Sequence, residues 1–167
     1  MLIAARMSER DDTRYRPCVG IMLVNGSGQA FVGNRIDNRE SGFWQMPQGG
    51  VDPGEELDAA MLRELGEEVG ARPEHLEIVA RLPDELVYDL PAELQGKLWG
   101  GRYRGQRQSW FLVRFTGTDA DVDLEAHDPP EFCEWKWVEP DELPDLIVPF
   151  KRGVYETIVE RFRDELP

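Results

Sequence analysis

Three glutamates near the middle of the chain have types and spacing that allow them to act together. They lie in residues 55–69, a Pro-free segment rich in Ala, Leu, Met and Glu that predicts a helix. Glu64, Glu67 and Glu68 are spaced i, i+3, i+4, which at about 100° per residue places the three carboxylates within an arc of about 100°. A neighbouring arc carries the apolar side chains that would face a core, Met61, Leu62, Leu65 and Val69.

Like charges at this spacing repel one another, so the pattern needs a compensating charge. The repulsion costs roughly a few tenths of a kcal/mol per pair in water, and more near a low-dielectric surface. Hard divalent cations that prefer oxygen ligands, Mg²⁺ or Mn²⁺, are the natural counter-charge. The alternative is a solvated acidic face on an acidic protein, and the spacing by itself favours that alternative.

The residues around the glutamates shift the balance toward a site. They match the pattern G-x5-E-x7-R-E-U-x-E-E-x-G-U, in which U is a bulky apolar residue. The matching residues are Gly49, Glu55, Arg63, Glu64, Leu65, Glu67, Glu68 and Gly70. With each residue type at roughly 5–10% usage, a chance match at a given start is below about one in ten million. Two departures are mild, because Ala71 is only smaller than usual and Gly66 costs about 1 kcal/mol of helix propensity at a variable position.

This pattern is the Nudix box, and on it the chain resembles the Nudix hydrolases. The resemblance implies an α+β fold, an αβα sandwich with a mixed β-sheet, and hydrolysis of a nucleoside diphosphate linked to another group. It implies Glu64, Glu67 and Glu68 as metal ligands, with the carbonyl of Gly49 as a further ligand. The chemistry agrees, because polyphosphate repels hydroxide and a metal ion both neutralises that charge and lowers the pKa of bound water.

The resemblance also implies a structural salt bridge between Glu55 and Arg63, which would fix the loop before the helix against the helix itself. On a helical wheel Arg63 falls outside the arc of the three glutamates. A structural role, apart from the acidic cluster, therefore suits Arg63.

Other segments narrow the resemblance to one group of the family. In chain order these are YRPCVGIMLVN (15–25), WQMPQGG (44–50), QSWFLVRFTG (108–117), PEFCEWKWV (130–138) and VPFKRGVY (148–155). Together they resemble the bacterial RNA pyrophosphohydrolases and the related asymmetric dinucleoside tetraphosphate hydrolases of bacteria and plants. The resemblance implies removal of pyrophosphate from the 5′-triphosphate end of RNA, leaving a 5′-monophosphate. The alternative is cleavage of diadenosine tetraphosphate to ATP and AMP.

Several residues outside the box take expected roles from this resemblance. Glu131 matches a glutamate that acts as a metal ligand or general base. The catalytic candidates are therefore Glu67, Glu68 and Glu131. Without the resemblance, Glu131 would be interpreted as one more acidic surface residue. Candidates for substrate binding are Arg16 and Arg35 at the phosphates, Val148 and Phe150 around a base, Lys151 beside them, and Tyr88 in the cleft. Base stacking on an aromatic ring would contribute about 1–3 kcal/mol.

Each of these binding roles has a plainer alternative. Phe150 could instead anchor the last helix to the core, and Tyr88 could instead be a half-buried packing residue on a strand. The two arginines would suit ordinary surface charge, although a protein of net charge −14 has few cations to place. One departure stands out: Ser109 occupies a position where relatives usually carry Lys, so Arg107 or another cation must replace it.

Charge and composition limit the partners. The chain has 33 acidic and 19 basic residues, giving a formal net charge of −14, which argues against bulk binding to DNA or an anionic membrane. We expect triphosphorylated RNA or a dinucleoside polyphosphate as partner. Cys18 and Cys133 fit free thiols in a reducing compartment, and no apolar run approaches the roughly 18 residues of a membrane span. We expect a cytoplasmic monomer.

Hydrophobic periodicity and turn residues predict the helices, strands and loops that would position these residues. Residues 1–14 are polar and without clear periodicity, which predicts a flexible N-terminal arm before one Nudix domain over 15–167. Loops are expected over 34–42 and 43–54. Strands are expected at 18–24, 30–32, 76–82, 85–90, 109–116 and 132–138, and a second helix at 150–163. Strands outnumber helices and alternate irregularly with them, which favours α+β.

Overall fold

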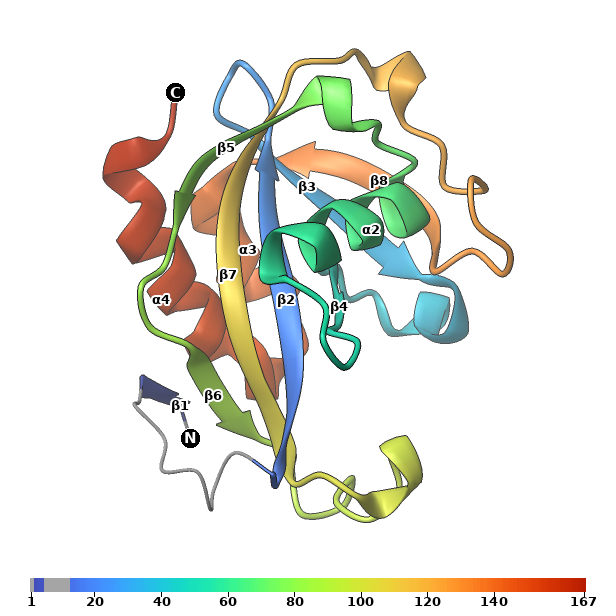
Figure 1. The fold of residues 1–167 in the computed structure, drawn as a ribbon, viewed down its shortest axis with the longest axis vertical. Helices are drawn as coiled ribbons and strands as arrows, with labels where there is room; N and C mark the ends of the chain where they lie inside the picture. The colour runs from blue at the N-terminus through green and yellow to red at the C-terminus, as the bar shows by residue number, and fades with distance from the viewer. Residues whose placement is uncertain (1, 5–12) are drawn as a thin grey trace.

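Two long parallel strands, β2 (Tyr15–Val24) and β7 (Gly105–Phe115), form the centre of the fold (Figure 1). The computed structural model describes residues 2–4 and 13–167 of the chain. The two strands pair in parallel from Tyr15 opposite Gly105 to Val24 opposite Arg114. Most of their side chains are buried on both faces, as expected for central strands covered by helices on either side.

The remaining strands extend this pair into a mixed sheet. The order is β1-β6-β7-β2-β3-β8, with β4 pairing β2 and β5 pairing β7, and all of these further pairs are antiparallel. The bounds are β1 Leu2–Ala4, β3 Ala30–Arg35, β4 Gln48–Gly50, β5 Leu76–Arg81, β6 Leu86–Asp89 and β8 Phe132–Val138. The prediction of a mixed sheet is therefore confirmed.

Helices cover both faces of the sheet. Helix α2 (Leu57–Val69) lies on one face, while α3 (Leu143–Leu146) and α4 (Arg152–Phe162) lie on the other (Figure 1). Two separate apolar clusters fill the layers, one under α2 and one under α3 and α4. The expected αβα sandwich is thus observed. Short 3-10 helices join the elements: η1 Ile36–Ser41, η2 Pro73–His75, η3 Trp99–Gly101, η4 Asp119–Asp121, η5 Pro140–Glu142, η6 Pro149–Lys151 and η7 Arg163–Glu165.

Helix α2 begins two residues later than the sequence predicts and ends as predicted. Glu56 is extended, with φ −69° and ψ 147°, so the first helical residue is Leu57. At the other end Gly70 adopts a left-handed conformation with φ 72°, and its backbone N–H donates to the carbonyl of Gly66. A glycine at this position ends a helix without the steric cost that a side chain would bring.

Three segments differ from the predicted loops and arm. The expected loop 43–54 contains β4, and the expected loop 34–42 contains η1. Within the predicted flexible arm, Leu2–Ala4 form strand β1, which pairs with the open edge of β6. Residues 5–12 of that arm lie outside the described residues. Both extra strands form because a neighbouring strand has unpaired backbone groups at its edge, which no local sequence signal reports.

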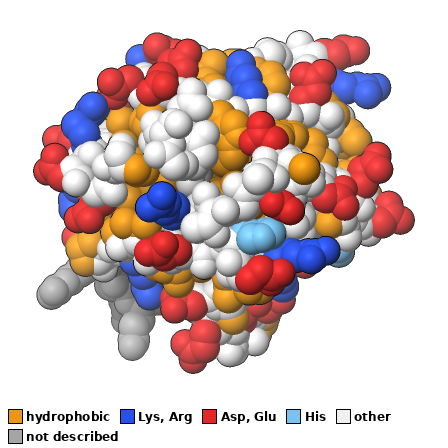
Figure 2. Space-filling model, turned by 90° about the horizontal axis from the view of Figure 1, so that it is seen from above, with side chains coloured by type: hydrophobic (Ala, Val, Ile, Leu, Met, Phe, Trp, Pro, Cys, Tyr) orange, Lys and Arg blue, Asp and Glu red, His pale blue; other side chains and the backbone are white. Residues whose placement is uncertain are grey.

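Acidic side chains are dispersed over the face of the molecule that Figure 2 shows from above, with only a few Lys or Arg side chains among them. This distribution agrees with the net charge of −14, and this face carries no broad basic patch. In residues 2–4 and 13–167 no helix has both the length and the apolar character to cross a bilayer.

Two glycines should respond to alanine in opposite directions. In Gly20→Ala the new Cβ would overlap the indole of Trp110, which is fully buried, so the variant should lose about 1–3 kcal/mol of unfolding free energy. In Gly66→Ala the Cβ meets nothing closer than 4.0 Å within helix α2, so helix propensity should add up to about 1 kcal/mol. Urea denaturation of both variants measures this, and a Gly20→Ala protein as stable as wild type would contradict it.

Candidate active site

The glutamates of helix α2 occupy different depths. Glu64 and Glu68 are 7% and 4% exposed, while Glu67 is half-buried. Burial raises the pKa of Glu64, and it raises the pKa of Glu68 further because Glu68 also faces the charges of Glu64 and Glu131. The two buried carboxyls lie close enough to share a hydrogen bond. Two acids held this way favour protonation or a cation between them.

Strand β4 brings a backbone against these carboxylates. The N–H of Gln48 donates to Glu68 Oε2 at 3.2 Å. A Cβ on Gly49 would overlap the carboxylate of Glu64, so only glycine allows this approach. The segment before β4 is anchored to α4, because the N–H of Met46 donates to the hydroxyl of Tyr155 at 2.9 Å. Both faces of the sandwich therefore set the position of β4.

Arg63 is more deeply involved in the acidic cluster than the helical wheel indicated. It forms the ion pair with Glu55, in which Nε and Nη2 each donate to the carboxylate at 2.9 Å, and Nη2 also donates to the Gly50 carbonyl at 2.8 Å. This pairing lowers the pKa of Glu55 to about 2.

Arg63 also reaches the metal-ligand candidates. Its Nη1 donates to Glu64 at 2.9 Å and to Glu67 at 3.4 Å. The prediction that Arg63 lies apart from the acidic arc was therefore wrong. Arg63 and Glu67 are four residues apart and so are neighbours on the helix surface.

The donor set suits a divalent cation, although it is not arranged around one. In the described part of the chain, no group of three or more His, Cys, Asp or Glu side chains is already placed to hold a metal ion. The guanidinium of Arg63 is ion-paired with both Glu64 and Glu67, at 2.9 and 3.4 Å. The buried carboxylates of Glu64 and Glu68, with their raised pKa values, and the half-buried carboxylate of Glu67 are oxygen donors of the kind that a hard cation prefers.

Glu131 and Arg35 belong to other segments than helix α2 but lie near its acidic cluster. Glu131 is exposed, and its carbonyl accepts the N–H of Ile36 at 2.9 Å just before β8 begins. Its charge acts on both Glu68 and Arg35. Arg35 is held by Asp37 through two hydrogen bonds of 2.9 and 2.7 Å, which raise the pKa of the guanidinium. A phosphate ligand would have to compete with Asp37 for Arg35.

A pocket of about 400 Å³, called the base pocket below, collects the other expected binding residues. Its lining includes four of the expected residues, Arg35, Val148, Phe150 and Lys151. Trp44 and Leu98, from other segments of the chain, also line it. Phe150 also packs against the apolar cluster under α4, so its two alternative roles, ligand contact and core anchor, are compatible.

Tyr88 lies beneath this pocket rather than in it. The side chain is 2% exposed and its hydroxyl donates to Gln106 at 2.9 Å. Its ring centroid is 5.9 Å from that of Phe150, and the ammonium of Lys151 lies 5.7 Å from the Tyr88 ring. The structure therefore places Tyr88 as a support for Phe150 and Lys151, and the alternative of packing on a strand describes it better than ligand contact.

A buried chain of amides joins the centre of the sheet to β4, and sequence reasoning missed it. Trp110 Nε1 donates to Gln108 Oε1 at 2.9 Å, which fixes the orientation of that amide. Gln108 Nε2 then donates to Gln48 at 3.1 Å and to Gln106 at 2.8 Å. A signal was present, because Gln106, Gln108 and Trp110 fall at every second position of β7 and so share one face of the strand.

Arg16 lies at the far end of β4. Its guanidinium lies 5.3 Å from the ring centroid of Trp99 and would meet any side chain added at Gly50. Ser109, the departure from the usual Lys, is 6% exposed and lines the same cavity as Arg16 and Arg107. Arg107 bonds Glu85 at 3.0 Å, so a replacement cation is present there but already has a carboxylate partner.

Comparison with known proteins agrees with this geometry. The model of the NUDIX domain family matches residues 14–158. The chain belongs to the NUDIX family. Two solved structures share the NUDIX fold at 20% identity: the E. coli dihydroneopterin triphosphate pyrophosphohydrolase, with TM-score 0.65, and a C. elegans Ap4A hydrolase, with TM-score 0.60. They cover 88% and 89% of this chain and 98% of their own.

Two relatives of higher sequence identity than these structures share one name. A protein of Erythrobacter litoralis named RNA pyrophosphohydrolase is 60% identical over 161 residues, 96% of this chain and 98% of that protein. One of Novosphingobium aromaticivorans with the same name is 63% identical over 150 residues, 90% of this chain and 93% of that protein.

Lys151 should make ligand binding by this NUDIX domain depend on pH. Burial lowers its pKa to about 8, and the nearby charge of Arg35 acts in the same direction. The ammonium is therefore lost as pH rises through about 8, so KM for a polyphosphate substrate should rise between pH 7 and 9. Lys151→Arg keeps its charge over this range and should flatten the profile. Parallel pH profiles for the two proteins would contradict the assignment.

Proposed function

We propose that the chain is a metal-dependent pyrophosphohydrolase that removes pyrophosphate from the 5′-triphosphate end of RNA and leaves a 5′-monophosphate. The observation that carries this proposal is the 60% identity, over 96% of the chain, to a protein named RNA pyrophosphohydrolase. The arrangement of the acidic cluster, the base pocket and Arg16 around β4 supports it.

In this proposal the acidic cluster holds the cofactor, and a glutamate in or beside the cluster accepts the proton. Glu64, Glu67 and Glu68, with the carbonyl of Gly49, would hold Mg²⁺ or Mn²⁺. When bound, the ion offsets phosphate charge and makes a water molecule more acidic. Water attacks the α-phosphorus of the triphosphate, its proton passes to Glu131 or to a box glutamate, and the α–β phosphoanhydride bond breaks with release of pyrophosphate.

The binding residues divide between phosphates and a base. Arg16 and Arg35 would bind the phosphate chain, since guanidinium groups pair well with phosphate oxygens. Val148 and Phe150 would hold a base between them in the base pocket, with Lys151 supplying positive charge. Tyr88 contributes by supporting Phe150 from below.

A second candidate activity is asymmetric hydrolysis of diadenosine tetraphosphate to ATP and AMP. The insertion between β6 and β7 favours it, because Leu94 and Leu98 of this segment line the base pocket while Trp99 stacks with Arg16. A segment that borders both ends of the site would suit a ligand with a nucleoside at each end. Comparing kcat/KM for triphosphorylated RNA and diadenosine tetraphosphate, with Mg²⁺, decides between them, and a strong preference for the dinucleotide would reverse the order proposed here.

The setting that we propose is a cytoplasmic monomer with no DNA partner. Cys18 and Cys133 are both free thiols, which supports a reducing compartment. The dispersed acidic surface in Figure 2 supports the absence of bulk binding to DNA.

Glu68→Gln tests the catalytic proposal. The amide keeps the shape of a side chain that is 4% exposed but removes its charge, so kcat should fall by about 100-fold or more while the fold survives. Initial rates on triphosphorylated RNA measure the loss, and circular dichroism checks the fold. Glu160→Gln, at an exposed position of α4, is the matched control. Unchanged turnover in Glu68→Gln would refute the metal assignment, and an inactive wild-type protein would favour a silent nucleotide sensor.

A further inference from the structure

A second cavity is lined by residues that directly follow β4, whereas the base pocket is lined by Gln45 before it. Its volume is about 580 Å³, and it lies between the loop that precedes α2 and the insertion between β6 and β7. The lining includes Arg16, Arg102, Tyr103 and Arg107, and we call it the arginine cleft. A cavity of this volume is large enough for a nucleotide-sized ligand.

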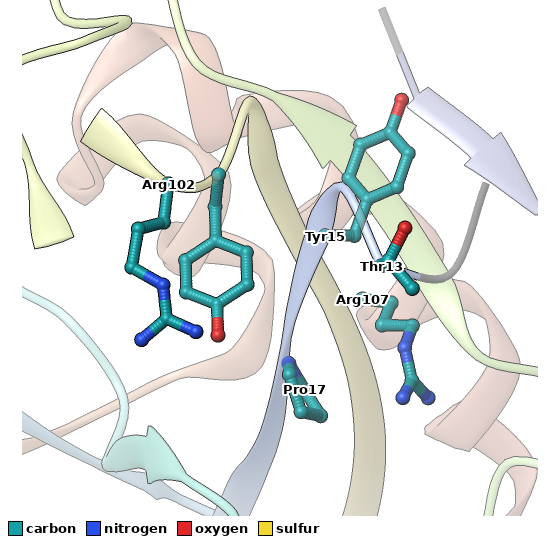
Figure 3. Close-up of a pocket in the computed structure, with 6 residues that line it drawn as sticks. Thr13, Tyr15, Pro17, Arg102 and Arg107 are labelled. Carbon is teal, nitrogen blue, oxygen red and sulfur yellow. The ribbon is translucent and has the colours of Figure 1, made fainter. Parts of the chain in front are cut away.

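The arginine cleft continues into a neighbouring hollow at the start of β2. That hollow, about 330 Å³ in volume, shares Pro17, Arg102, Tyr103 and Arg107 with the cleft. Figure 3 shows Arg102 and Arg107 on either side of Pro17, with both guanidinium groups extending toward the same end of the hollow. Two cations from different segments thus face one space.

The order of the chain places the arginine cleft and the base pocket at opposite ends of β4. Gln45 lines the base pocket, whereas Val51 and Gly54 line the arginine cleft. Between them Gly49 lies against Glu64 of the acidic cluster. An extended chain rises about 3.3 Å per residue, so Gln45 and Val51 are up to about 20 Å apart. Along the chain, the residues that line these features therefore follow in the order base pocket, acidic cluster, arginine cleft.

Charge in the cleft favours an anion. Its acids are engaged: Glu85 pairs with Arg107, and Arg63 of helix α2 pairs with Glu55 and lies 3.7 Å from Asp52. Arg102 is exposed and, like Arg16, has no ion pair with a carboxylate among residues 2–4 and 13–167. In a protein of net charge −14, two such cations at one cleft are available to phosphate oxygens.

Aromatic rings accompany these cations. The Arg102 guanidinium lies 5.5 Å from the ring centroid of Tyr103, and Arg16 lies 5.3 Å from that of Trp99. Tyr103 and Trp99 meet edge to face at 6.3 Å. Tyr103 is half-buried and lines the cleft, so its ring offers a surface on which a base can stack.

We propose that the arginine cleft is a second subsite, which takes the end of the substrate's phosphate chain that lies beyond the scissile bond. Arg102 binds its terminal phosphates, and Tyr103 stacks on a nucleoside when one caps that end. The subsite rests on the proposed function, and it extends that function to dinucleoside polyphosphates. Triphosphorylated RNA presents bare phosphates to the cleft, whereas a dinucleoside tetraphosphate presents phosphates and a nucleoside.

Arg102→Gln tests the phosphate part of the proposal. KM should rise about tenfold for both triphosphorylated RNA and diadenosine tetraphosphate, with kcat within about twofold of wild type, because one charge-assisted contact is lost away from the reacting atoms. Arg161→Gln, an exposed arginine on α4, is the matched control and should leave KM unchanged. An Arg102→Gln protein with wild-type KM for both substrates overturns the proposal.

Tyr103→Ala tests the nucleoside part. KM for diadenosine tetraphosphate should rise about tenfold, while KM for triphosphorylated RNA stays within about twofold of wild type. Tyr103→Phe keeps the ring, so it should recover most of the affinity for diadenosine tetraphosphate that Tyr103→Ala loses. Equal effects of Tyr103→Ala on the two substrates, or no effect on the dinucleotide, overturn the stacking role.

Binding of inorganic tripolyphosphate separates failure of the subsite from failure of the proposed function. The measurement is calorimetric, on the full chain with Mg²⁺. Should the wild-type chain hydrolyse neither substrate, the proposed function fails, yet weaker tripolyphosphate binding by Arg102→Gln than by wild type and Arg161→Gln still supports the cleft. Equal binding by all three proteins overturns it.

Discussion

The repulsion among closely spaced glutamates of helix α2 is the constraint on which the rest of the site depends. Glu64 and Glu68 are buried with raised pKa values, so ionising both at neutral pH lowers the stability of the folded state. Arg63 offsets part of this cost by donating to Glu64 and Glu67. A bound divalent cation would offset it more completely and would take over the carboxylates that Arg63 now holds. In the proposed function, this remaining repulsion is what a bound cation would relieve.

Strand β4 connects the acidic cluster of helix α2 to the central sheet. Three residues of β4, Gln48–Gly50, pair with β2 and so connect the acidic cluster to the centre of the sheet. The amide chain through Gln108 and Trp110 fixes the Gln48 side chain, while Tyr155 of α4 anchors the segment from the opposite face. One cavity is lined by Gln45, just before β4, and another by Val51, just after it, so the proposed base and phosphate subsites would both border this short strand.

Local signals in the sequence were enough to predict helix α2, its C-terminal glycine and the spacing of its glutamates, because each depends on residues within one or two helical turns. The same local reasoning misjudged Arg63, since a long guanidinium reaches beyond the direction in which its Cα–Cβ bond points. Strand β4 was not predicted, because the Gly and Pro residues around it indicate a loop and because its partner strand β2 is distant in sequence. The burial of Tyr88 and the arginine cleft depend on how the insertion folds back onto β2, which no local pattern records.

The most direct test of the central claim is a titration of the metal-free protein with Mn²⁺, followed by electron paramagnetic resonance. Glu64 is 7% exposed and contacts both Gly49 and Arg63, so Glu64→Gln should raise the Kd for Mn²⁺ about tenfold or more. Glu160→Gln, on the far helix α4, should bind as wild type does. Wild-type affinity in Glu64→Gln would contradict the account, because the metal would then bind somewhere other than the acidic cluster.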